Sequence, residues 1–275
     1  MRIEPVSFEG YSGVRLEDDG VRVTVITSVG PRVLELDGGA GNLLAVLPDA
    51  GLDRPDGGRF RLLGGHRLWA APEVPDVTYQ PDERPCAVAE VEDGVRVEAP
   101  PDGVGLVRSI EVRRDPEGWV VDHALRNASR GPMTIAPWAI TQFRLGGEVE
   151  LPTGPRGAGP QADRALVLWP YTDPSDPRVR FERDAVRVRA EPGGQALKLG
   201  AAPSEGRVAY RLEGQRFEKR ISVDDGATYV DRGAAVQVYL NDDFVELETL
   251  GPLLPVEPGE QVAHRERWAL EGGPA

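Results

Sequence analysis

Two carboxylates lie two residues apart in the segment FVELETLGPL, residues 244–253. Side chains alternate between the faces of an extended strand, so Glu246 and Glu248 point the same way, roughly 7 Å apart. Such neighbours raise the pKa of at least one carboxyl group where water is scarce. The pair therefore suits acid/base chemistry or the binding of sugar hydroxyls, although a plain solvent-facing strand has the same pattern.

A second group of chemically useful side chains follows two glycines in LGGHRLWAAPE, residues 63–73. The glycines allow a close approach of the backbone. His66 works as an acid or base near neutral pH, Arg67 and Glu73 bind hydroxyls or carboxylates, and Trp69 can stack on a sugar face. This mixture is typical of a polyol or sugar site, and a turn followed by an ordinary strand is the alternative.

Further polar candidates are scattered through the rest of the chain. His123 and His264 lie on alternating segments; His123 is interpreted as a packed structural histidine and His264 as a surface or structural one. No HExxH, Gly-x-Ser-x-Gly or phosphate-binding glycine loop is present, so neither a metal nor a cofactor is expected. The other candidate binding residues, each of which could also be a surface residue, are Gln142, Trp169, Lys198 and Lys219.

The elements that must position these residues are short strands. Apolar and polar residues alternate along nearly the whole chain, and no window keeps a helical period. Turn residues between alternating runs predict hairpins over 87–98 and 106–127. Other strands are predicted at 21–26, 31–36, 186–189, 208–212, 217–223, 235–240, 244–250 and 261–270. Ten or more strands at short spacing predict an all-β sandwich or barrel.

A single β domain is predicted over residues 1–275. The stretch 146–160 is rich in Gly and Pro, which indicates a long loop that could link two domains. Strands of similar character lie on both sides of it, and the composition does not change there. We therefore interpret this stretch as an excursion from one domain.

Charge and composition exclude several kinds of partner. The net charge is −13 and the chain carries no basic stripe, so neither nucleic acid nor an anionic membrane surface is expected. No segment approaches a membrane span and the N-terminus lacks an apolar signal core, which predicts a soluble cytoplasmic protein. Cys86 is the single cysteine, so no internal disulfide can form. The sequence indicates no particular oligomeric state.

Four motifs resemble those of DUF4380, a bacterial family of unknown function, and occur in the same order. They are GGHRLWAAPE (64–73), PWAITQ (137–142), LWPYT (168–172) and ELETLGPL (246–253). The resemblance covers most of the chain. That family is in turn similar to aldose 1-epimerases, which implies a galactose mutarotase-like β-supersandwich of large antiparallel sheets and a small-molecule carbohydrate as partner.

The resemblance also implies site residues. Mutarotases open the pyranose ring with a glutamate base and a histidine acid, and a second histidine helps to bind the sugar. Their glutamate lies in a late Glu-Thr-Gln stretch, which Glu248-Thr249-Leu250 resembles, so Glu248 is the implied base. Their histidines would fall at 140–142 and 78–81, where this chain has no imidazole. His66 would have to act as the acid instead.

Three functions are compatible with these residues. The first is an epimerase or mutarotase-like isomerase, with Glu248 as base, His66 as acid and Glu246 tuning the base. The second is a non-catalytic carbohydrate-binding protein on the same scaffold. The third is a glycoside hydrolase or lyase, for which Glu73 opposite Glu248 would be the better carboxylate pair. The residues expected to bind the substrate are Arg67, Trp69, Glu73, Gln142, Trp169, Lys198, Lys219 and Glu246.

Overall fold

Strands make up most of the computed structural model, which describes residues 1–154, 159–160, 162–202 and 206–272. Every strand predicted from the alternation is present, and the all-β class is confirmed. Among the described residues, helix is confined to two single turns, α1 (Pro75–Thr78) and α2 (Val230–Gly233). None of the described helices is long and apolar enough to cross a membrane.

The first of two large antiparallel sheets has eleven strands within the described residues. Its order is β1 (Arg2–Phe8), β2 (Tyr11–Asp18), β3 (Val21–Ile26), β4 (Arg32–Asp37), β7 (His66–Ala71), β12 (Met133–Phe143), β21 (Val245–Leu250), β20 (Val236–Leu240), β17 (Leu197–Ala201) and β14 (Leu166–Leu168), with β22 (Leu254–Val256) also paired to β12.

The second sheet has ten strands in the described part of the chain. Its order is β15 (Val179–Phe181), β16 (Ala185–Arg189), β13 (Glu148–Pro152), β18 (Gly206–Leu212), β19 (Gln215–Ile221), β23 (Gln261–Glu271), β11 (Gly118–Asn127), β10 (Leu106–Asp115), β9 (Gly94–Glu98) and β8 (Ala87–Val91). A separate hairpin is formed by β5 (Val46–Asp53) and β6 (Arg59–Gly64).

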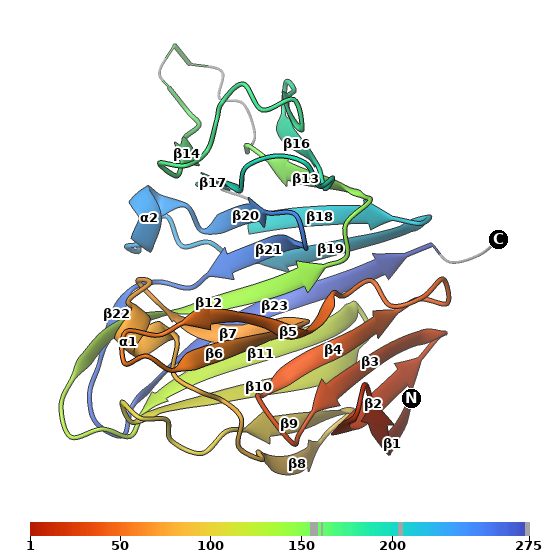
Figure 1. The fold of residues 1–275 in the computed structure, drawn as a ribbon, viewed down its shortest axis with the longest axis vertical. Helices are drawn as coiled ribbons and strands as arrows, with labels where there is room; N and C mark the ends of the chain where they lie inside the picture. The colour runs from red at the N-terminus through yellow and green to blue at the C-terminus, as the bar shows by residue number, and fades with distance from the viewer. Residues whose placement is uncertain (155–158, 161, 203–205, 273–275) are drawn as a thin grey trace.

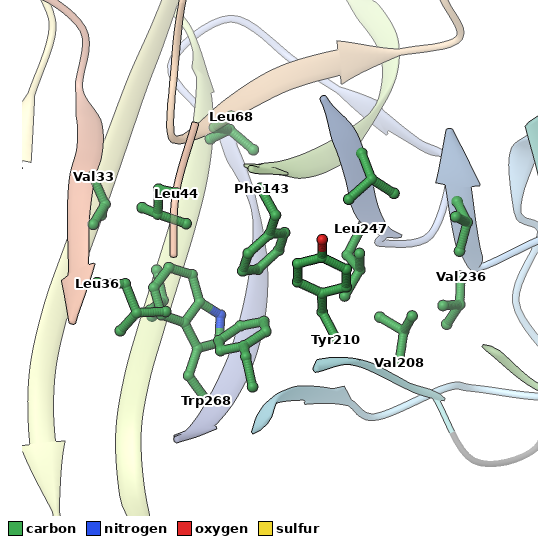
Figure 2. Close-up of a cluster of buried hydrophobic side chains, with 14 of the residues drawn as sticks. Val33, Leu36, Leu44, Leu68, Phe143, Val208, Tyr210, Val236, Leu247 and Trp268 are labelled. Carbon is green, nitrogen blue, oxygen red and sulfur yellow. The ribbon is translucent and has the colours of Figure 1, made fainter. Parts of the chain in front are cut away.

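The two sheets pack face to face (Figure 1). Their apolar side chains form the largest core cluster. In Figure 2, Phe143 and Leu247 of the first sheet meet Tyr210 and Trp268 of the second. Burial of such side chains away from water is the main stabilising contribution in a sandwich of this kind.

The outer face of the first sheet is also covered, by the β5–β6 hairpin. A second cluster there joins Phe60 of β6 to Trp69 of β7 and Trp138 of β12. The aromatic rings meet edge to face, with centroids 5.4 Å apart for Phe60–Trp69 and 5.4 Å for Trp69–Trp138. The central strands of the first sheet are therefore buried on both sides.

This double burial decides between the two interpretations of the glutamate strand. All six residues of β21 are buried, with Val245 and Leu247 in the core between the sheets. Glu246 and Glu248 share the opposite, outer face and are only 7% and 0% exposed. The alternation is as predicted, but a solvent-facing strand is excluded.

The two glycines before His66 form the corner between β6 and β7. Both have positive φ, +82° at Gly64 and +70° at Gly65. A Cβ atom would lie 1.9 Å from the carbonyl oxygen of Ala45 at Gly64, and 2.1 Å from that of Val33 at Gly65. The predicted close approach of the backbone is therefore an approach to neighbouring backbone and not to a ligand.

The prediction of one long loop at 146–160 is wrong in part. Residues Glu148–Pro152 form β13, which pairs with β16 and β18 in the middle of one half of the second sheet. Alternating Val149 and Leu151 are fully buried, and this short apolar pattern was masked by the glycines and prolines around it. Residues 155–158 lie outside the described part of the chain.

Candidate functional site

A cleft of about 690 Å³ opens on the outer face of the first sheet. Its floor comes from β7, β12, β17, β20 and β21, and the β5–β6 hairpin and the segment after β7 form walls. Six aromatic side chains line it: Trp69, Tyr79, Trp138, Tyr171, Tyr239 and Phe244. The charged residues of the lining are Arg59, Arg67, Glu73, Lys198, Asp243 and Glu246.

Strand register brings distant parts of the sequence to this floor. Lys198 on β17 lies opposite Tyr239 on β20, which lies opposite Glu246 on β21, which lies opposite Gln142 on β12. Residues that are directly opposite on paired strands project from the same face of a sheet. The side chains of Lys198, Tyr239 and Glu246 consequently form a row across the floor. Gln142 continues this row but is fully buried and does not line the cleft, and 104 residues separate it from Glu246 in the chain.

Of the two neighbouring glutamates on β21, Glu246 is the one that reaches the cleft. Its Oε1 accepts hydrogen bonds from Arg67 Nη2 at 3.1 Å and Gln142 Nε2 at 3.0 Å. Burial raises the pKa of Glu246 to about 7; Arg67 opposes this shift and the neighbouring Glu248 adds to it. The group can thus exchange a proton near neutral pH, as a general base must.

Glu248 lies deeper and does not line the cleft. It is fully buried, and its Oε2 accepts hydrogen bonds from Trp138 Nε1 at 2.7 Å and Lys198 Nζ at 2.8 Å. The Lys198 ammonium also contacts the rings of Trp138 at 4.7 Å and Trp169 at 4.8 Å. Trp169 therefore holds Lys198 from the side and is not itself part of the lining.

Arg67, Trp69 and Glu73 all line the cleft, as the sugar-site interpretation requires. The Arg67 guanidinium stacks on the Trp69 ring, with Cζ 4.3 Å from its centroid. Glu73 is exposed at the rim, where it accepts a hydrogen bond from the Tyr79 hydroxyl. Burial and that carboxylate raise the pKa of Tyr79, so its phenol stays protonated.

His66 and Lys219 do not reach the cleft, contrary to the sequence-based expectation. Both are 0% exposed and lie between the two sheets. His66 and Arg67 are adjacent on β7, so their side chains must point to opposite faces of the first sheet. Because Arg67 faces the cleft, His66 faces the second sheet, and the pairing of His66 with Glu248 as acid and base is not formed.

The buried His66 belongs to an ordered hydrogen-bond network. His123 Nδ1 lies 3.0 Å from the carbonyl oxygen of His264 and must donate to it, so Nε2 of a neutral His123 ring accepts. His66 Nε2, 2.7 Å away, is then the donor, and His66 Nδ1 accepts from the Thr141 hydroxyl at 2.9 Å. Burial lowers the pKa of all three histidines, to about 3 for His264, which keeps the rings neutral.

An ion pair completes this interior network. Lys219 Nζ lies 2.8 Å from Glu266 Oε1 and also donates to Thr141 Oγ1 at 3.2 Å. Burial alone would raise the pKa of Glu266, but the Lys219 ammonium outweighs this effect and holds that pKa well below its usual range. Trp268 Nε1 satisfies the second carboxylate oxygen at 2.7 Å.

One group in the described residues has donor atoms close enough to hold a metal ion. His66, His123 and Glu266 place these atoms within 4.8 Å of one another. Each of these potential ligand atoms already takes part in a hydrogen bond described above. The Lys219 ammonium supplies the positive charge beside Glu266. The geometry favours protons over a metal at this place.

Several lining residues were not among the predicted site residues. Trp138 and Tyr171 belong to motifs quoted above, so the motif order could have indicated them. Tyr79 lies in 78–81, where the mutarotase resemblance places a histidine. Tyr239, Asn241 and Asp243 carried no signal, because only the pairing of β20 with β21 brings them to the cleft.

Comparison with known proteins supports the fold. No protein-family model matches the chain, and no curated protein does, so the resemblance to DUF4380 stays a prediction. A solved structure of a candidate aldose 1-epimerase from Escherichia coli K12 is 12% identical, with a TM-score of 0.58 over 94% of this chain and 98% of that one.

Two further solved structures give the same result. A galactose mutarotase-like protein from Lactobacillus casei is 10% identical, with a TM-score of 0.55 over 94% of this chain and 100% of its own. One from Clostridium acetobutylicum is 11% identical, with a TM-score of 0.52 over 98% of each chain. At such identities the likeness concerns the fold. The chain has the galactose mutarotase-like fold, with large antiparallel sheets packed face to face.

Proposed function

We propose that the cleft binds a carbohydrate and that Glu246 transfers a proton at its anomeric centre, as in an epimerase or mutarotase-like isomerase. Glu246 would take the proton of the C1 hydroxyl while the bond between C1 and the ring oxygen breaks. The ring oxygen receives a proton from an acid, and the open aldehyde rotates about C1–C2. Closure returns both protons and yields the other anomer.

The observation that carries this proposal is the position and pKa of Glu246. Of the two buried glutamates, Glu246 lines the cleft and Glu248 does not. Burial raises the pKa of Glu246 to about 7. A base whose pKa lies near the working pH combines a useful ionised fraction with a strong pull on the proton. The resemblance implied Glu248 as base, but the bonds of Glu248 to Lys198 and Trp138 favour a supporting role.

The walls of the cleft fit a sugar. Aromatic rings such as Trp69 and Tyr79, with centroids 5.3 Å apart, provide apolar faces against which the C–H groups of a pyranose can stack. Arg67 and Glu73 also line the cleft and supply a hydrogen-bond donor and an acceptor of the kinds that bind sugar hydroxyls.

Non-catalytic carbohydrate binding is the second candidate. The three histidines of the chain all belong to the part that the structure describes, and they lie between the two sheets. The cleft therefore has no imidazole, which favours this candidate. A hydrolase or lyase is less well supported. The pair it would need, Glu73 and Glu248, comprises one exposed rim residue and one fully buried residue already bonded to Lys198.

The test measures anomer exchange directly. Freshly dissolved α-D-glucose and α-D-galactose are followed by NMR with the wild type, Glu246→Gln and the matched surface control Glu90→Gln. We expect the wild type to accelerate exchange with a rate that rises with pH through about 7 as the Glu246 carboxylate forms. Glu246→Gln should lose about 10²–10⁴-fold, and Glu90→Gln, exposed on β8, should lose nothing.

The outcomes separate the candidates. Sugar binding by calorimetry with no acceleration of exchange would support the binding protein and refute the isomerase. Neither binding nor acceleration with any aldose of a wider panel would refute both. Acceleration that survives in Glu246→Gln would remove Glu246 as the base.

A further inference from the structure

Lysine is used at only two positions in this chain. Of the 32 basic residues, Lys198 and Lys219 are lysines and all others are arginines. Both lysines are buried, at 5% and 0% exposure. Each ammonium lies 2.8 Å from a buried glutamate, Glu248 for Lys198 and Glu266 for Lys219. Lysine is thus confined to buried ion pairs.

Arginine and lysine differ in two properties that matter at such places. A guanidinium is bulky, planar and always protonated, whereas an ammonium is compact and can release its proton. For Lys219 the compact shape is enough to explain why the position holds lysine and not arginine. Its ammonium fits between three acceptors in the packed interior, Ala139 O, Thr141 Oγ1 and Glu266 Oε1. Lys198 differs because it lines a cleft with room beside it.

Lys198 also lies in the cleft where the proposed reaction needs an acid for the ring oxygen. It belongs to the row across the floor that contains Glu246, with Tyr239 between the two. The rings of Trp138 and Trp169 and the Glu248 carboxylate hold the ammonium in place. A sugar ring lying over Tyr239 would therefore have a carboxylate on one side and an ammonium on the other.

We propose that Lys198 is the acid that gives its proton to the sugar ring oxygen, in place of the histidine that this cleft lacks. The inference rests on the proposed function. As the bond between C1 and the ring oxygen breaks, Glu246 takes the proton of the C1 hydroxyl and the ring oxygen takes one from the Lys198 ammonium. The resulting amine can still donate a hydrogen bond to Glu248 Oε2, 2.8 Å away. Ring closure returns both protons, so no other reactant is needed.

Contact with the sugar can be tested because the chain has so few lysines. Protein labelled with ¹⁵N and ¹³C at lysine gives side-chain signals from Lys198 and Lys219 only, and Lys198→Arg assigns them. D-glucose or D-galactose, whichever binds by calorimetry, should shift the Lys198 signal and leave that of Lys219 in place. Sugar binding with an unmoved Lys198 signal would overturn the proposal.

Proton transfer is tested by kinetics. Lys198→Arg keeps a cation beside Glu248 but cannot release a proton, so sugar affinity should stay within about threefold while kcat falls about 10²-fold or more. Lys198→Ala should recover activity with added primary amines, at rates that follow the amine pKa. A structural role would not produce that dependence.

The results distinguish this inference from the function on which it rests. If the wild type accelerates anomer exchange and Lys198→Arg, folded by circular dichroism, keeps the wild-type kcat, Lys198 is not the acid but the isomerase stands. Rescue of Lys198→Ala that is equal for amines of any pKa would also refute the acid. A wild type that neither binds nor accelerates refutes the proposed function and this inference together.

Discussion

Removing Lys219 should destabilise the protein strongly, because it leaves a buried carboxylate without its cation. Lys219 and Glu266 are both 0% exposed and 2.8 Å apart, and Thr249 and Trp268 would be the remaining hydrogen-bond donors to Glu266. Breaking a buried ion pair from one side costs about 3–5 kcal/mol. For Lys219→Met, at roughly 2–4 °C for each kcal/mol, we expect Tm to fall by roughly 6–20 °C.

The assay is chemical and thermal unfolding at pH 7, with two matched variants. Arg265→Ala breaks an ion pair of similar length, 2.6 Å to Asp122, but its arginine is 57% exposed, so its loss should stay within about 1 kcal/mol. The double variant Lys219→Met/Glu266→Gln removes the lone charge and should recover part of the stability. The reasoning is refuted if Lys219→Met loses no more than Arg265→Ala.

Two further predictions concern the same interior and the corner beside it. Acidification should lower the free energy of unfolding, because burial holds the pKa of the interior histidines below 6.5 and the unfolded chain takes up protons first. The slope is at most about 1.4 kcal/mol per pH unit for each histidine. Glu246 has the opposite effect, because its pKa of about 7 means that the folded protein takes up this proton before the unfolded chain does. The urea midpoint should therefore fall more steeply between pH 7 and pH 5 in Glu246→Gln than in the wild type. Parallel curves for the two proteins would contradict this. Gly65 and Gly57 both have positive φ. The Cβ of Gly65→Ala would lie 2.1 Å from the Val33 carbonyl oxygen, whereas the Cβ of Gly57→Ala would meet no atom within 4 Å. Thermal unfolding should therefore show a loss of about 1–2 kcal/mol for Gly57→Ala and a clearly larger one for Gly65→Ala; equal losses would show that the clash relaxes.

Local patterns carried most of the information about the strands. The hairpin predicted at 106–127 is formed by β10 and β11, because Asp-Pro-Glu-Gly marks the turn between two alternating runs. Strands such as β1, β2 and β5 were not predicted, and β13 was taken for part of a loop because it lies between a pair of glycines and a proline-rich stretch. Its alternating run holds only two buried apolar residues, Val149 and Leu151, too few to outweigh the glycines and prolines on both sides.

The candidate site was predicted less completely. Arg67, Trp69, Glu73, Lys198 and Glu246 do line one cleft. Strand alternation could already have separated His66 from Arg67 and Trp69, since neighbours on a strand point to opposite faces. Because His66 was grouped with Arg67 and Trp69 by its position in the chain, it was wrongly expected to be the acid partner of Glu248.

The sequence by itself determined the alternation of each strand, the shared face of Glu246 and Glu248, and the glycine corner before His66. These are local properties, because they depend on residues a few positions apart. Only the tertiary structure decided which strand faces meet the second sheet and which line the cleft. Those assignments depend on the pairing of β7, β12, β21, β20 and β17, which are distant in sequence except for the consecutive strands β20 and β21. The same pairing gives Glu246 access to the cleft, ties Glu248 to Lys198 and places the histidines in the interior.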